Sequence, residues 1–126
     1  MTPLGLLAVG AGAALGAWLR WAFSLAWNAL NPSLPYGTLA ANLLGGYLIG
    51  IAVGMFGDHV ELSPEWKLLV MTGFLGGLTT FSTFSAEVLA NVSAGNYAAA
   101  ALHISVHVLG SCLLVAAGLW TYRLLA

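Results

Sequence analysis

The chain has 126 residues, of which 60% are hydrophobic and only 6% are charged. A soluble domain carries about a quarter of charged residues, so this composition indicates an integral membrane protein. The formal net charge of −1 excludes a general basic surface for nucleic acid, and the single Cys112 excludes an intramolecular disulfide. Since a membrane-spanning helix needs roughly 20 apolar residues, the length allows four spans and little else.

The sequence predicts an all-α membrane protein that forms a single four-helix transmembrane domain over residues 1–126. The spans are expected at about residues 4–26, 36–56, 65–90 and 97–119. All four prolines fall outside these spans or at their starts, where a missing backbone N–H is tolerated, and this supports the boundaries.

The first span combines a smooth face with one charge. Ala8, Gly12 and Gly16 recur every fourth residue, a spacing that lets another helix approach closely. Arg20 follows. Its guanidinium either snorkels to the membrane interface, which is the simpler interpretation, or lies at a pore mouth and raises the local concentration of anions.

The second span carries two overlapping Gly-x-x-x-Gly units at Gly46, Gly50 and Gly54. Asn42 lies one step earlier in the same register, so it belongs on or beside the closely packed face. An asparagine at such a place is ordinarily a hydrogen bond between helices. Its amide also offers two N–H donors to an anion.

The third span contains a stretch, residues 72–87, that is unusual at membrane depth because it holds three glycines, a dense run of hydroxyls and a carboxylate. The adjacent Gly76 and Gly77 predict a break in the helix, since glycine has a low helical preference. The carbonyls freed near Gly76 and Thr79 would then be available to a cation. The alternative is a close helix contact, which the same small residues also favour.

After the predicted break, two kinds of side chain separate onto two faces. Thr80, Thr83 and Glu87 share one face at helical spacing, and Phe81 and Phe84 share another. The hydroxyls suggest a polar path, and aromatic ring edges carry partial positive charge that suits an anion.

The fourth span has a polar stripe, because His103, His107 and Ser111 recur every fourth residue. Two histidines at this spacing are able to bind zinc, but the sequence shows no third ligand near them. A wet path or a helix interface is therefore the favoured interpretation.

With four spans, both chain ends and the loop that precedes Lys67 share one side of the membrane. That side has Lys67 and Arg123, whereas the other has Arg20 alone. Lysine and arginine excess sets the orientation, and this excess is weak. Insertion in both orientations would allow an antiparallel homodimer with the broken helices crossing at a two-fold axis.

Three motifs, residues 16–21 (GAWLRW), 37–46 (GTLAANLLGG) and 73–85 (GFLGGLTTFSTFS), resemble the CrcB/Fluc family of fluoride channels. The resemblance covers essentially the whole chain. It implies an antiparallel, dual-topology homodimer with two pores, which lowers cytoplasmic fluoride by passive export through the plasma (inner) membrane of a prokaryote. It also implies a structural sodium ion at the dimer centre, held by the main-chain carbonyls of Gly76 and Thr79.

The resemblance assigns side chains to three further groups. The implied fluoride pore is formed by Asn42, Phe81, Phe84 and Ser111. The implied polar track is formed by Thr80, Ser82, Thr83, Glu87 and His103, with Arg20 at the vestibule.

Two other functions are open from the residues alone. A small proton-coupled multidrug exporter would also have four helices and dual topology, and would use Glu87 as the carboxylate that exchanges protons. A non-transporting assembly subunit would explain the small-residue faces but not the run of hydroxyls. Enzyme activity is not expected, because no nucleophile, base and orienting group are arranged together.

Overall fold

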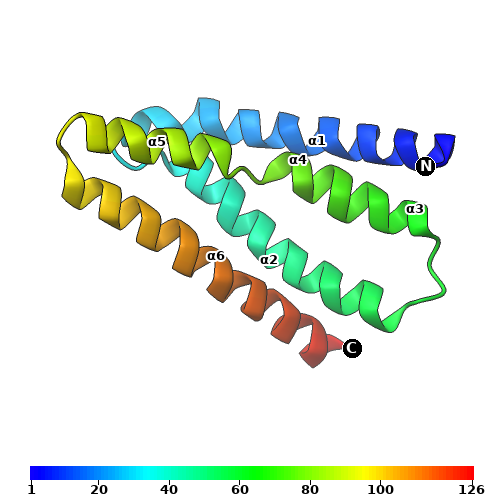
Figure 1. Cartoon of the computed structure of the whole chain (residues 1–126). Coiled ribbons are helices and arrows are strands. Elements are labelled where there is room, and N and C mark those ends of the chain that lie inside the picture. Colours follow the sequence, from blue (N-terminus) through cyan, green and yellow to red (C-terminus); the bar gives the residue numbers. More distant parts are fainter.

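The computed structural model describes residues 1–126 and consists of helices and their connections (Figure 1). Four helical segments are long and apolar enough to cross a membrane, as the sequence predicted. These segments are Pro3–Leu30, Tyr36–Asp58, Pro64–Ser93 and Tyr97–Leu125. Each extends a little beyond its expected bounds, because helical backbone continues into the flanking interfacial residues.

The elements follow one another in a simple order. They are α1 (Pro3–Trp27), η1 (Asn28–Leu30), α2 (Tyr36–Asp58), α3 (Pro64–Lys67), η2 (Leu68–Leu75), α4 (Gly76–Leu78), α5 (Ser82–Ser93) and α6 (Tyr97–Leu125). The segment η2 has the wider π-helical hydrogen bonding, and α3, η2 and α4 form one continuous rod. Both chain ends lie at the same end of the molecule, as expected for four crossings (Figure 1).

Local chemistry fixes several helix ends. The side chain of Thr2 accepts a hydrogen bond from the backbone N–H of Gly5 at 3.0 Å, directly before the proline that begins α1. Gly95, with φ of +74°, reverses the chain between α5 and α6 in a conformation that side chains with a Cβ rarely adopt.

The helices pack as two main pairs, α1 with η2 and α4, and α2 with α6. Small residues allow this closeness. A Cβ on Gly12 or Gly16 of α1 would overlap backbone atoms of η2 and α4, and a Cβ on Gly50 of α2 would overlap the carbonyl of Val115 on α6. The close-packing faces predicted for the first two spans are therefore confirmed.

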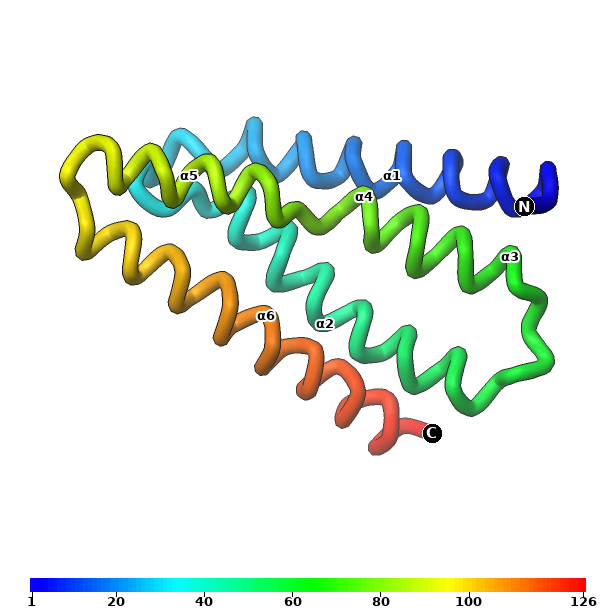
Figure 2. The backbone as a smooth tube through the Cα atoms, in the orientation of Figure 1, coloured from blue at the N-terminus to red at the C-terminus, as the bar shows by residue number.

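The third span is interrupted between α4 and α5, where the chain runs through residues 79–81 without helical coils (Figure 2). Thr79 is extended, with φ of −81° and ψ of 154°. Gly76, by contrast, has helical angles of −64° and −34°. Gly76 and Gly77 themselves belong to α4 and the helix ends after Leu78, so the interruption lies at the Thr79 end of the stretch Gly76–Thr79 where the break was predicted.

Candidate functional site

Asn42 on α2 holds the interruption through the backbone of one residue. The N–H of Thr80 donates to Asn42 Oδ1 at 2.7 Å, and Asn42 Nδ2 donates to the Thr80 carbonyl at 2.9 Å. One side-chain amide thus satisfies both backbone groups of a residue outside the helix, which would otherwise be costly at membrane depth. The expected hydrogen bond between helices is confirmed. Binding of an anion by the Asn42 amide stays a prediction.

Two carbonyls beside the interruption have lost their helical partners. The amide one turn after Gly76 is that of Thr80, which donates to Asn42. The amide one turn after Thr79 is that of Thr83, which donates to Thr80 Oγ1 at 3.1 Å. The carbonyls of Gly76 and Thr79 are therefore free of the α-helical hydrogen bond that each would normally accept.

Arg20 reaches the same region from α1. Its Nε donates to the Gly77 carbonyl at 3.0 Å, between the two freed carbonyls in sequence. The guanidinium satisfies one orphan carbonyl at the end of α4 and opposes the negative end of the helix dipole. Arg20 is thus tied to the interruption rather than extended freely to the interface, and its predicted place at a vestibule stays a prediction.

An open pocket of about 450 Å³ lies against the interruption. Seven of the residues predicted for pore, polar track and cation site line it: Asn42, Gly76, Thr79, Thr80, Phe81, Phe84 and Ser111. The other predicted residues, Arg20, Ser82, Thr83, Glu87 and His103, lie outside its lining. The structure therefore gathers the predicted pore residues in one place and sets most of the polar track apart.

The two phenylalanines differ in their surroundings. Phe81 is 78% exposed, whereas Phe84 is buried. Their rings meet edge to face, with centroids 5.5 Å apart and planes at 63°. Phe84 also stacks on His107, with centroids 4.6 Å apart. One ring is therefore fixed by packing, while the other is exposed at the surface of the chain.

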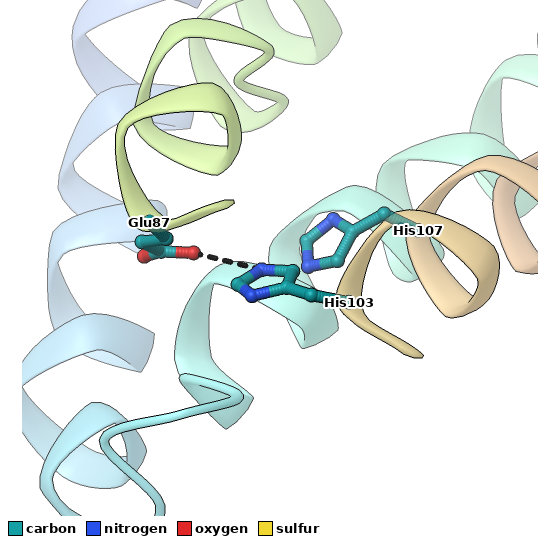
Figure 3. A group of neighbouring side chains, drawn as sticks. All are labelled: Glu87, His103 and His107. Atoms are coloured by element: carbon teal, nitrogen blue, oxygen red, sulfur yellow. Dashed lines mark ion pairs between the residues drawn. The ribbon is translucent and has the colours of Figure 1, made fainter. Parts of the chain in front are cut away.

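A buried polar cluster lies beyond Phe84, where Glu87 of α5 meets His103 and His107 of α6 (Figure 3). Glu87 Oε2 and His103 Nε2 are 3.2 Å apart, although they are not aligned as a hydrogen bond. The candidate ligand atoms of the three residues all lie within 4.8 Å of one another. The expectation that no third candidate ligand lies near the histidine pair was wrong, because Glu87 comes close to the pair from another span.

Thr38 completes this cluster and was missed by the sequence analysis. It is 1% exposed, and its hydroxyl donates to Glu87 Oε1 at 2.6 Å. Asn28 holds Thr38 in place, since Asn28 Oδ1 accepts the Thr38 N–H at 3.0 Å. A signal was present, because Thr38 lies four residues before Asn42 and so shares its helix face.

Comparison with known proteins places this site in context. Residues 7–119 match the family described as CrcB-like protein, Camphor Resistance (CrcB). The chain is 70% identical to proteins of Cupriavidus taiwanensis and Cupriavidus necator, each named fluoride-specific ion channel FluC, over the full length of both chains. It is 56% identical to a protein of the same name from Pseudomonas putida, over 93% of this chain and 92% of the relative.

Proposed function

The chain belongs to the CrcB family, and from this premise we propose that it is a fluoride channel. The observation that carries the proposal is the full-length identity of 70% to relatives named fluoride-specific ion channels. The four apolar helices make the chain a multi-pass membrane protein. The named relatives are bacterial, which supports a bacterial plasma membrane as its location.

The lining of the pocket suits a small, strongly hydrated anion. Fluoride must exchange its water for donors, yet it must also leave again, so binding has to be firm but not trapping. Asn42 and Ser111 contribute polar groups, and Phe81 and Phe84 can contribute ring edges. The lining contains no lysine, arginine or carboxylate. We therefore propose these four residues as the fluoride pore.

A second copy of the chain is part of the proposal. The pocket is open, and Phe81 is 78% exposed although its neighbour Phe84 is buried. An antiparallel homodimer would cover this face and create two equivalent pores, one on each side of a two-fold axis. The weak charge difference between the two sides of the subunit is compatible with insertion in both orientations.

The carbonyls of Gly76 and Thr79 fit a structural sodium ion at that axis. Both lack the α-helical hydrogen bond that they would normally accept, and two copies of the chain would supply four neutral oxygens. Neutral oxygens provide no charge neutralisation for a divalent ion, which favours a monovalent one. When bound, the ion would satisfy carbonyls that are costly to leave bare in a membrane.

The direction of transport follows from passive conduction. A channel moves fluoride down its electrochemical gradient, so we propose net export that lowers cytoplasmic fluoride. Flux from proteoliposomes offered fluoride or chloride tests this. Strong fluoride flux without a proton gradient, and little chloride flux, are expected. Comparable chloride flux would contradict the proposal.

A proton-coupled exporter is the alternative, and it makes Glu87 indispensable. The structure pairs this carboxylate with Thr38 and sets it beside His103, apart from the open pocket. We expect Glu87→Gln to keep measurable fluoride flux, because a channel requires no acid that exchanges protons. Complete loss of flux in a folded dimer of this variant would restore the exporter.

A further inference from the structure

His107 is held in one tautomer by its neighbour Asn42. The amide of Asn42 has a fixed orientation, because its Oδ1 accepts the N–H of Thr80 and its Nδ2 donates to the Thr80 carbonyl. Nδ2 then faces Nδ1 of His107 at 3.1 Å. An amide nitrogen has only protons to offer, so His107 Nδ1 accepts. This contact therefore favours a neutral ring whose single proton lies on Nε2.

The ring of His107 is also fixed in space. It is 3% exposed and stacks on Phe84, with ring planes 26° apart. The ring of His103 lies on another side, with centroids 4.7 Å apart. The Nε2 atom of His107 is buried without any hydrogen-bond partner. An unpartnered buried N–H is costly, so this group is a donor ready for an acceptor.

The same cluster has the composition of a metal site. Two histidines and one carboxylate form a familiar donor set for zinc. Glu87 Oε2 and His103 Nε2 are 3.2 Å apart, which is close to the spacing of two ligands on one metal ion.

The tautomer of His107 opposes metal binding. A histidine that binds a metal through Nε2 carries its proton on Nδ1 and donates it to a carboxylate, carbonyl or water. Asn42 instead presents a donor to that nitrogen. With a metal on Nε2, the N–H of His107 Nδ1 would face the N–H of Asn42 Nδ2, and neither group could accept a hydrogen bond.

We propose that Asn42 is a positioning residue that keeps His107 as an Nε2–H donor. His107, the member of the cluster that also lines the open pocket, then presents a proton to an anion instead of a lone pair to a divalent cation. The identity of that anion as fluoride rests on the proposed function, whereas the tautomer and the exclusion of metal do not. An uncharged donor in this place also agrees with binding that is firm but reversible.

Nitrogen NMR of histidine-labelled protein in detergent tests the tautomer directly. Two-bond nitrogen–proton couplings distinguish a protonated ring nitrogen from an unprotonated one, and the signal that disappears in His107→Gln assigns His107. We expect Nε2 to be protonated and Nδ1 to be unprotonated. A proton on Nδ1 of His107, or on both ring nitrogens, at neutral pH would overturn the proposal. This result in the wild-type protein would be sufficient by itself.

The variant Asn42→Asp tests the cause of the tautomer. A carboxylate accepts where the amide donated, so the His107 proton should move to Nδ1 and free the lone pair of Nε2. The cluster should then bind Co²⁺, with the visible absorption typical of tetrahedral coordination. Wild type and Asn96→Asp, which adds the same charge at an exposed site, should not bind it. Equal Co²⁺ binding by wild type would contradict the proposal, as would an unchanged tautomer in folded Asn42→Asp.

Fluoride flux separates this inference from the proposed function. His107→Gln retains an N–H donor and should conduct, whereas His107→Leu should lose about tenfold in flux, the equivalent of one hydrogen bond. Equal flux in the two variants would show that the donor is not used by the anion. Absence of flux in wild type, with the expected NMR result, would refute the channel but leave the tautomer assignment intact.

Discussion

The third span has two faces that are stabilised by different means. Towards α1, its rod meets the glycines of that helix with backbone against backbone, so that a Cβ on Gly77 would overlap the carbonyl of Ala13. Towards the pocket, the neighbouring Gly76 is exposed, and the nearest atom to a Cβ there would be Met71 O at 3.7 Å. One face is thus specified by shape, and the other by hydrogen bonds from Asn42.

This difference explains how one helix can be both anchored and open. Close packing along α1 holds the rod up to Leu78, so the chain can leave the helix directly afterwards without losing its position. The freed backbone then depends on side chains for its hydrogen bonds. The open pocket and the free carbonyls beside it are therefore supported from behind by close backbone contact with α1.

The largest expected effect compares two adjacent glycines. Gly77→Ala should destabilise the protein by about 1–3 kcal/mol, because the added methyl group must displace the backbone of α1. Gly76→Ala is the matched control and should cost less, because within the chain the nearest atom to a Cβ there is Met71 O at 3.7 Å. Thermal unfolding of the purified variants measures both. Similar losses at the two positions would show that the contact between Gly77 and α1 does not determine the cost.

The next prediction concerns the open face. Asn42→Ala should cost about 2 kcal/mol, because both backbone groups of Thr80 lose their partners at once. Ser111→Ala is the control, since Ser111 lines the same pocket, whereas the hydrogen bonds to the backbone of Thr80 come from Asn42. Denaturant unfolding in detergent should separate the two variants. Equal stability would mean that residues 79–81 need no side-chain support.

The sequence was sufficient for the number of helices and for their packing faces, since both follow from patterns within one segment. Apolar runs located the four spans, and glycines at every fourth residue located the seams. The exact residue at which the helix ends was not predictable in this way. Gly76 and Gly77 have the weakest helical preference in this stretch. The helix nevertheless ends after Leu78, where Asn42 of another span accepts a hydrogen bond from the N–H of Thr80. Tertiary hydrogen bonds overrode local propensity.

The buried cluster shows the same limit. The spacing of His103 and His107 revealed a stripe on one helix, but Glu87 and Thr38 join it from two other spans. A periodic pattern cannot report which faces of different helices meet. The four residues predicted for the pore line one pocket. The residues predicted for the polar track do not form one path, because Thr80 lines the pocket, Glu87 and His103 belong to the cluster, and the other two belong to neither.

The smallest expected effect lies where the two faces meet, at Thr79. Its hydroxyl donates to the Leu75 carbonyl at 2.9 Å, and its methyl group fills the space that a Cβ on Gly45 would need. Thr79→Ser keeps the hydroxyl and the free backbone carbonyl and removes only that methyl group. The cost should be about 1 kcal/mol, with no loss of fluoride flux.

A double variant tests whether the methyl group of Thr79 packs against Gly45. Gly45→Ala alone should destabilise by more than Thr79→Ser, because its methyl group overlaps that of Thr79. Combined, the two changes exchange one methyl group for another across the same contact, so the pair should recover most of the lost stability. Thermal unfolding of the two single variants and the double variant gives the coupling. If the stability losses of the two single variants simply add, the Thr79 methyl group does not fill this space. Loss of fluoride flux in Thr79→Ser would assign the side chain a role beyond packing.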